Sequence, residues 1–254
     1  MWIDTHAHLY DFSDNEIQDL CNSAGSASLG AIVSTATDLK TTKTVINHCV
    51  NHPGLFGAVG ISPFDCDNLP RGWESILEQN LREYNIIGLG EIGLDTTNPR
   101  YPSFEKQLPV FEQQLDIAKR TDIPVIIHSR GFEKRTAELC RKNGCSKAVF
   151  HCFTGDFDAA ATILDNGYYI SFSGILTFRN AAIRELIPKL PLERLMLETD
   201  TPYLAPVPFR GKTNTPLYMR YIGEEAALLI KKSPDELQSH LKTNFTALFN
   251  ICIK

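Results

Sequence analysis

The first side chains that could do chemistry are two histidines near the N-terminus, His6 and His8. Residues two apart in a β-strand project from the same face, so both imidazoles can point at one metal ion. Asp4 shares this face, where it either orients an imidazole or caps a backbone group. A short H-x-H motif also occurs by chance, so the pair needs support from elsewhere in the chain.

Four further histidines and carboxylates lie at or just beyond the C-terminal ends of other apolar runs. They are Glu91, His128, His151 and Asp200. The C-terminal ends of the strands of a parallel barrel open on one face, where active sites are built. We therefore expect four imidazoles and two carboxylates to meet in one small volume. Buried carboxylates are costly unless cations neutralise them, so this pattern predicts a metal site.

Six ligands are more than one catalytic zinc site needs, because such a site uses about three protein ligands. They suit two divalent ions if one carboxylate bridges, and Glu91 is the natural bridge because it lies between the histidine pairs in strand order. The two ions would be held by His6, His8 and Asp200 and by His128 and His151, respectively. Glu91 and Asp200 are the candidate catalytic residues, since a carboxylate at such a site can take a proton from metal-bound water.

Cationic and aromatic residues follow the expected ligands. The candidates for substrate binding are Arg130, Tyr203, Arg210 and Lys212, with Phe209 beside them. Arginine can clamp a phosphate and an aromatic ring can stack on a base. The alternative is a solvated rim whose aromatic rings pack against the barrel. For Lys134 and Arg135 we favour a plain helix surface.

Two smaller features near the expected ligands have ordinary explanations. Cys152 directly follows His151, and neighbours in a strand face opposite ways, so we expect a small buried residue and no Cys/His pair. The glycines around Glu91 either let an ion or substrate approach the backbone or allow tight helix–strand packing.

The elements that must position these residues are eight apolar, β-rich runs that alternate with helical patterns. The runs are residues 2–5, 30–35, 55–60, 86–92, 123–128, 148–151, 168–173 and 195–198. About thirty residues per strand–helix unit is the size of a βαβ repeat. The pattern predicts an α/β fold, a (β/α)8 TIM barrel, formed as a single domain by residues 1–254. An amphipathic stripe marks a helix over 104–118, and a capping box at Ser233 starts a last helix that closes the barrel or covers its end.

Composition excludes several classes of protein. The 254 residues carry a formal charge of −5, which argues against non-specific coating of nucleic acid. We find no signal peptide and no apolar run of the roughly 18 residues that a membrane span needs. Seven cysteines without a C-x-x-C pair are typical of reduced thiols. We therefore expect a cytoplasmic protein with no membrane association and no obligate protein partner.

Six motifs, taken together, resemble those of the TatD family of metal-dependent hydrolases. They are Asp4-Thr-His-Ala-His-Leu9, Gly90-Glu-Ile-Gly-Leu-Asp95, Pro124-Val-Ile-Ile-His-Ser-Arg130, His151-Cys-Phe-Thr-Gly155, Glu198-Thr-Asp-Thr-Pro-Tyr-Leu204 and Arg210-Gly-Lys212. The resemblance implies an amidohydrolase-type barrel and a divalent-metal-dependent deoxyribonuclease, a 3′-to-5′ exonuclease linked to DNA repair. It also implies metal binding by the same six residues.

The chain departs from the family pattern at the substrate rim. Ser62 stands where the family usually has a histidine, Gly131-Phe132 replaces Asp-Ala, and Thr213 and Thr215 replace an arginine and a glutamate. Hydrolysis is therefore a firmer prediction than DNA as the substrate.

The sequence thus predicts a hydrolase with two divalent ions (Mg, Mn or Zn) that cleaves phosphodiester bonds at single-stranded or frayed DNA ends. The alternative is a hydrolase of amide, lactone or amine bonds on the same barrel. Many such enzymes use a modified lysine as the bridge, and Glu91 occupies that place here, which favours the nuclease. A non-catalytic, metal-stabilised scaffold is the third option, but an open carboxylate-rich site is a poor structural staple.

Overall fold

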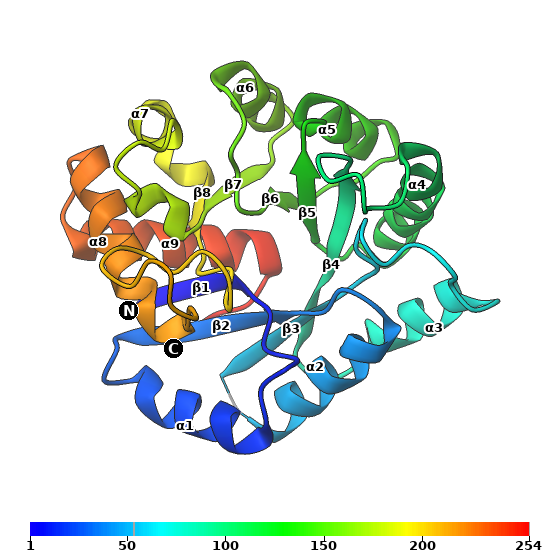
Figure 1. The fold of residues 1–254 in the computed structure, drawn as a ribbon, viewed down its shortest axis with the longest axis horizontal. Coiled ribbons are helices and arrows are strands. Elements are labelled where there is room, and N and C mark those ends of the chain that lie inside the picture. The colour runs from blue at the N-terminus through cyan, green and yellow to red at the C-terminus, as the bar shows by residue number, and fades with distance from the viewer. Residues whose placement is uncertain (53, 254) are drawn as a thin grey trace.

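The computed structural model describes residues 1–52 and 54–253 (Figure 1). Eight parallel strands form one sheet in the order β1 to β8. The strands are β1 (Trp2–Ala7), β2 (Leu29–Thr35), β3 (Leu55–Val59), β4 (Ile86–Asp95), β5 (Val125–Arg130), β6 (Ala148–Phe150), β7 (Tyr169–Phe172) and β8 (Leu195–Leu197). The helices are α1 (Asp14–Ala24), α2 (Leu39–Asn51), α3 (Trp73–Asn80), α4 (Phe104–Thr121), α5 (Glu133–Lys142), α6 (Phe157–Asp165), α7 (Ile183–Leu186), α8 (Met219–Ile230) and α9 (Pro234–Phe249). The predicted (β/α)8 barrel is confirmed.

The first strand meets the last one through the segment that follows β8. The Asp200 amide donates to the His6 carbonyl at 3.0 Å, and the His8 amide donates to the Thr201 carbonyl at 2.6 Å. The Thr5 hydroxyl adds a hydrogen bond to the Leu197 carbonyl at 3.0 Å. These bonds join the two ends of the sheet, and they bring Asp200 next to His6 and His8.

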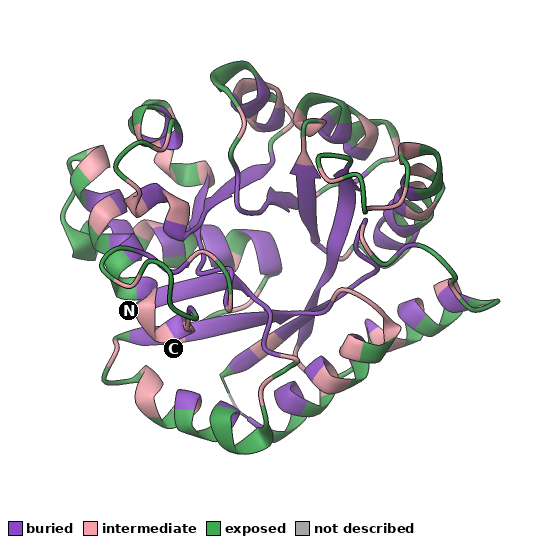
Figure 2. Ribbon diagram, in the orientation of Figure 1, coloured by how far each residue is buried: buried purple, intermediate pink, exposed green. Residues whose placement is uncertain are grey.

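The strands are buried on both faces because helices cover the outside of the sheet (Figure 2). This explains why their sequences are apolar runs without alternation. One predicted boundary was short: the run assigned to 86–92 continues to Asp95 as β4. The extension is paired with β5, where Gly93 lies opposite His128 and Asp95 opposite Arg130.

The last helix covers one end of the barrel. The predicted capping box is present, since the Ser233 hydroxyl accepts from the Glu236 amide at 3.2 Å and the Glu236 carboxylate accepts from the Ser233 amide at 3.0 Å. Toward the C-terminal end of α9, Phe245 and Leu248 pack in one cluster with Ile3 of β1 and apolar residues of the other seven strands. The barrel is therefore filled with apolar side chains at the α9 end, and the polar site lies at the opposite, C-terminal end of the strands.

Helix α4 differs from its expected amphipathic stripe. Phe111, Leu115 and Ala118 are buried as predicted, but Gln107 and Gln114 are buried beside them. No helix among the described residues combines the length and the apolar character needed to cross a membrane.

Candidate metal centre

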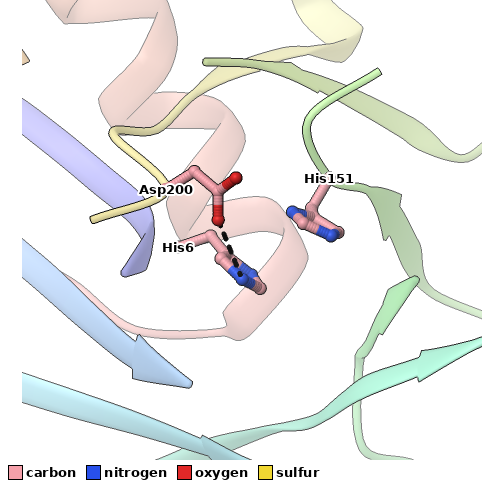
Figure 3. A group of neighbouring side chains, drawn as sticks. All are labelled: His6, His151 and Asp200. Atoms are coloured by element: carbon pink, nitrogen blue, oxygen red, sulfur yellow. Dashed lines mark ion pairs between the residues drawn. The ribbon is translucent and has the colours of Figure 1, made fainter. Parts of the chain in front are cut away.

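The six side chains expected to meet do so at the C-terminal end of the barrel. His6 lies on β1 and His8 directly after it, Glu91 on β4 and His128 on β5. His151 directly follows β6, and Asp200 follows β8. All six residues are buried, Asp200 the least at 8% exposed. Figure 3 shows His6, His151 and Asp200 pointing toward one another from three different strand ends.

One half of the cluster joins the N-terminal histidines to both carboxylates. The Nε2 atoms of His6 and His8 are 3.2 Å apart. His8 Nε2 lies 3.4 Å from Glu91 Oε2 and 3.6 Å from Asp200 Oδ1. His6 Nε2 lies 3.8 Å from the same Glu91 oxygen and 3.9 Å from Asp200 Oδ1.

The other half uses the second oxygen of Glu91. Its Oε1 lies 2.6 Å from His128 Nδ1 and 3.0 Å from His151 Nε2, and these two nitrogens are 3.0 Å apart. The Glu91 carboxylate thus presents one oxygen to each histidine pair, which is the arrangement of a bridging ligand. Imidazole nitrogens and carboxylate oxygens packed this closely form a donor set that fits divalent ions.

The ring nitrogens that point away from the cluster also have partners. His8 Nδ1 lies 3.1 Å from the Thr35 carbonyl, and His6 Nδ1 lies 3.5 Å from the Thr35 hydroxyl. His128 Nε2 lies 3.0 Å from Asp95 Oδ2, and His151 Nδ1 lies 3.1 Å from Glu198 Oε1. Such contacts fix the ring orientation and tautomer of metal-binding histidines.

Asp95 and Glu198 are functional candidates that sequence reasoning missed. Both lie inside motifs that were recognised, but the strand carrying Glu91 was expected to end at Ile92. Since β4 runs to Asp95, residues 91 and 95 share one face of that strand. Continuing the period-two pattern from Glu91 through Gly93 leads to Asp95.

Of the two alternatives for Asp4, the structure supports the backbone cap. Its carboxylate accepts from the Thr199 amide at 2.9 Å, from the Thr199 hydroxyl at 2.5 Å and from the His6 amide at 3.3 Å. Burial raises the pKa of Asp4 to about 8. Asp4 joins β1 to the segment after β8, and in the described part of the chain it makes no hydrogen bond to an imidazole nitrogen.

Burial and neighbouring charges shift the pKa values of His151 and Asp200 upward and that of Glu91 downward. Although burial opposes charging, Glu91 and Glu198 raise the pKa of His151 to about 10. Against the same burial, the imidazoles of His151 and His128 hold the pKa of Glu91 well below its usual range. Burial raises the pKa of Asp200 to about 6. A proton on His151 thus balances the carboxylates, and a metal ion would compete with it.

The glycines around Glu91 serve strand–strand packing, which neither of the two sequence interpretations anticipated. A Cβ at Gly90 would lie 2.6 Å from the Ile126 Cβ and 2.9 Å from the Ile126 carbonyl oxygen. A Cβ at Gly93, whose φ is +148°, would overlap the His128 carbonyl oxygen. Both glycines therefore allow β4 to lie close to β5, which carries His128.

A cavity of about 210 Å³ opens over five of the six residues, His8, Glu91, His128, His151 and Asp200. Besides ligand candidates, it is lined by Tyr10, Thr37, Phe64, Asp65, Arg130 and Tyr203. Of the Lys and Arg side chains in residues 1–52 and 54–253, Arg130 is the one that lines this cavity. Two of the four predicted substrate-binding residues, Arg130 and Tyr203, thus lie at the site.

The other rim candidates lie outside the cavity lining. Arg210 is exposed and stacks 4.5 Å over the Phe178 ring, and the Lys212 ammonium lies 5.9 Å from the Phe209 ring. Phe209 itself stacks on Tyr218 at 3.9 Å, so that face of its ring is covered.

Two residues of the departing motifs shape the rim indirectly. The Ser62 hydroxyl is buried, donates to Asp65 Oδ2 at 2.9 Å and accepts from the Phe64 amide at 3.2 Å. It therefore holds the turn that brings Phe64 and Asp65 to the cavity. Asn214, between the two departing threonines, donates to the Thr199 and Tyr203 carbonyls at 2.8 and 2.7 Å and so fixes the segment that carries Tyr203.

Cys152, Lys134 and Arg135 make packing and surface contacts near the site. Cys152 is buried as expected, with its sulfur 3.1 Å from the Ser173 hydroxyl. Lys134 pairs with Asp158 at 3.3 Å, and the Arg135 guanidinium lies 4.4 Å over the Phe104 ring. Both cations thus belong to contacts on the surface of α5.

Comparisons with known proteins agree with this architecture. The family model described as TatD related DNase matches residues 3–250. The metal-dependent hydrolase YabD of Bacillus subtilis is 30% identical over 99% of this chain and 100% of its own length. YcfH of Escherichia coli K12, also named a metal-dependent hydrolase, is 34% identical over 98% of this chain and 96% of its own.

Solved structures show the same relationship in three dimensions. The crystal structure of YjjV, a TatD homologue from Escherichia coli K12, matches with a TM-score of 0.92 and 32% identity over 98% of each chain. A TatD family hydrolase from Entamoeba histolytica shares the fold, with a TM-score of 0.85 at 22% identity over 98% of this chain and 97% of its own. The family match over nearly the whole chain, together with these identities, shows that the chain belongs to the TatD-related DNase family.

Proposed function

We propose that the protein is a divalent-metal-dependent hydrolase that cleaves phosphodiester bonds at DNA ends. The position of Glu91 carries this proposal, because its two oxygens face two separate groups of buried imidazole nitrogens. Membership of a family whose relatives are named metal-dependent hydrolases supports hydrolysis. The description of the family model supports DNA as the substrate.

The six clustered residues would hold two ions, with Glu91 between them. One ion would be held by His6, His8 and Asp200 and the other by His128 and His151, which also lies near His6 and Asp200. When bound, such ions make water acidic enough to supply hydroxide at neutral pH and neutralise charge on phosphoryl oxygens. Imidazole ligands suit Zn²⁺ or Mn²⁺ better than Mg²⁺, which prefers oxygen ligands.

Asp200 would take the proton of the attacking water. Its carboxylate lines the cavity, and its backbone is fixed by hydrogen bonding to His6. A carboxylate held at the cavity wall can accept the proton of the attacking water, and the departing oxygen can take its proton from solvent. We assign this role to Asp200 and the bridging role to Glu91.

Substrate contacts would come from the aromatic and cationic side chains of the cavity. Arg130 would donate to the phosphate, since a guanidinium matches phosphate geometry with paired N–H groups. Tyr203, whose ring centre is 6.0 Å from that of His8, and Phe64, 4.8 Å from His128, would stack on a terminal base. A base must leave the duplex to be stacked in this way, which favours single-stranded or frayed ends. Arg210 and Lys212 would contact phosphates farther along the strand.

A second function has one observation in its favour. The cavity is small, and Asp65 places an additional carboxylate at its wall. A carboxylate repels phosphate and attracts amino groups, so a small amide, lactone or amine substrate would also suit this site. Arg130 favours the phosphodiester because it adds a cation to the same cavity.

The deciding experiment offers both substrate classes to the same protein. Chelated protein would be supplied with Mg²⁺, Mn²⁺ or Zn²⁺ and incubated with end-labelled single-stranded DNA, blunt duplex, RNA and a panel of lactones and amides. We expect shortening of single-stranded DNA that stops with chelator and is lost in Asp200→Asn. Hydrolysis of lactones or amides with intact DNA would establish the second function instead.

A further inference from the structure

A buried glutamine of α4 holds the backbone of Asp95. Gln107 is 1% exposed, and its Oε1 accepts from the Asp95 amide at 2.8 Å. Its Nε2 donates to the Asp95 carbonyl and to the Pro102 carbonyl, both at 2.6 Å. The side-chain amide thus satisfies the backbone N–H and C=O groups of Asp95 at the end of β4, as a neighbouring strand would.

The Asp95 carboxylate is held at both oxygens. Oδ1 accepts from the Thr97 amide at 2.7 Å and from the Thr97 hydroxyl at 2.6 Å. Oδ2 lies 3.0 Å from His128 Nε2. With its backbone clamped by Gln107 and one oxygen bonded to Thr97, the carboxylate has little freedom to turn away from His128.

His128 faces the metal centre with the opposite ring nitrogen. Its Nδ1 lies 2.6 Å from Glu91 Oε1 and 3.0 Å from His151 Nε2. A nitrogen that binds a metal offers a lone pair, so the ring proton must reside on Nε2. Asp95 is the acceptor for that proton, and it therefore selects the tautomer that leaves Nδ1 free.

The same helix provides an internal comparison. Gln114, two turns after Gln107, is also buried and makes the same pair of bonds to another residue: its Oε1 accepts from the Ile61 amide at 2.7 Å and its Nε2 donates to the Ile61 carbonyl at 2.9 Å. Ile61 has no side chain that could orient a histidine. The two clamps make the same pair of backbone bonds; they differ in the additional bond from Gln107 to Pro102 and in what the clamped residue holds.

We propose that Gln107 is a positioning residue of the metal centre, which acts through Asp95 to hold His128 with Nδ1 directed at a divalent ion. The inference rests on the proposed function only in requiring that ion, and it holds whichever bond the enzyme hydrolyses. Helix α4 thereby determines part of the metal affinity without contributing a ligand.

The test compares Zn²⁺ affinity, measured by competition with a chromophoric chelator, in four variants of the full chain. We expect Asp95→Asn to lower the affinity by roughly 10–100-fold, as removal of a residue behind a ligand does. Gln107→Leu should lower it in the same direction by less. The double variant should bind no more weakly than Asp95→Asn alone, because Gln107 acts through Asp95. Gln114→Leu, the matched control, should lose as much stability as Gln107→Leu and keep the wild-type affinity.

Nitrogen NMR of the Zn²⁺-loaded protein supplies a second measurement. The wild type should show His128 protonated at Nε2 with Nδ1 bound to the ion, and Asp95→Asn should show a fraction of His128 in which Nδ1 is no longer bound to Zn²⁺. Wild-type affinity in Asp95→Asn or Gln107→Leu, or an equal loss in Gln114→Leu, would overturn the inference. If Gln107→Leu does not fold, Gln107→Glu can replace it, because the glutamate keeps an acceptor for the Asp95 amide. This variant should also bind Zn²⁺ more weakly than the wild type.

These outcomes separate the inference from the proposed function. Protein that binds Zn²⁺ with the expected order of affinities but leaves DNA intact would refute the DNA substrate alone. Protein that degrades DNA while the Gln107 variant keeps full Zn²⁺ affinity would refute the positioning role alone.

Discussion

Glu91 Oε1 lies 2.6 Å from Nδ1 of His128, while its Oε2 faces the Nε2 atoms of His6 and His8. One side chain therefore belongs to both halves of the cluster. Replacing Glu91 with Gln keeps the shape but removes the charge and one oxygen, so both ions should bind more weakly. We expect a loss larger than the roughly 10–100-fold that follows removal of a residue behind a ligand. Isothermal titration calorimetry with the metal measures both binding events. If Glu91→Gln weakened only one of them, Glu91 would not bridge the two ions.

Asp200 lines the cavity and presents one carboxylate oxygen, Oδ1, to both His6 and His8. In Asp200→Asn the side-chain volume is kept, but the amide cannot accept the proton from water. We expect kcat to fall by roughly 10²–10⁴-fold, the usual contribution of a general base, with a smaller change in KM. Steady-state kinetics on single-stranded DNA measure both constants. Turnover at the native rate would remove Asp200 from the proton-transfer step.

Arg130 and Arg210 can be told apart by the length of the substrate. Arg130 lines the cavity, whereas Arg210 lies outside its lining and stacks on Phe178. Arg130→Ala should raise KM for a dinucleotide and for a long strand alike. Arg210→Ala should raise KM more than it lowers kcat, and only for strands long enough to reach the loop after Asp200. Kinetics on an oligonucleotide length series test this, and equal effects of Arg210→Ala at every length would place that residue at the reacting phosphate.

The barrel and the cluster of six side chains were predictable because each depends on a local pattern. Strands buried on both faces read as apolar runs, and parallel strands align their C-terminal ends, so residues such as His128 and His151 had to meet. The positions of Asp95 and Gln107 depend instead on where β4 ends and on which face α4 turns inward. A buried glutamine interrupts an apolar stripe in the sequence, and only its partner on the neighbouring strand shows why it is there.

The rim illustrates a second limit of prediction. Phe209 has the right residue type to stack on a base, yet one face of its ring is covered by Tyr218. Phe64 lies outside the motifs that predict the site, yet it lines the cavity because the Ser62 hydroxyl shapes the turn that carries it. Loop conformation sets which aromatic side chains reach a cavity, and residue type alone does not determine it.

His48 on α2 should make stability depend on pH. Its Nδ1 is buried without a partner among the described residues, and its Nε2 lies 3.6 Å from Asp14 Oδ1. Burial lowers the pKa of His48 from its usual 6.5, although Asp14 opposes the shift. The unfolded chain then binds more protons than the native state, so the free energy of unfolding should fall as the pH drops through 6.5.

The His48 contribution is measured as a difference between two proteins. Urea unfolding of wild type and His48→Asn, both with chelator, would be followed from about pH 8 to about pH 5, the range in which histidine changes its charge. The variant should lose less stability than the wild type over this range, because it lacks the group that charges on unfolding. Parallel curves for the two proteins would show that His48 does not contribute to the pH dependence.

Gly93 should tolerate no side chain, because its Cβ would overlap the His128 carbonyl oxygen on β5. Gly131 is the control, because its φ is +75° but a Cβ added there would meet no atom within 4 Å. A substitution there measures the cost of the positive φ without steric overlap. Gly131→Ala should cost about 1 kcal/mol from its backbone conformation. Gly93→Ala should cost more than about 3 kcal/mol, because the backbone of β5 cannot move without shifting His128. Denaturant unfolding compares the two variants, and equal losses would mean that β4 and β5 are not in close contact at this point.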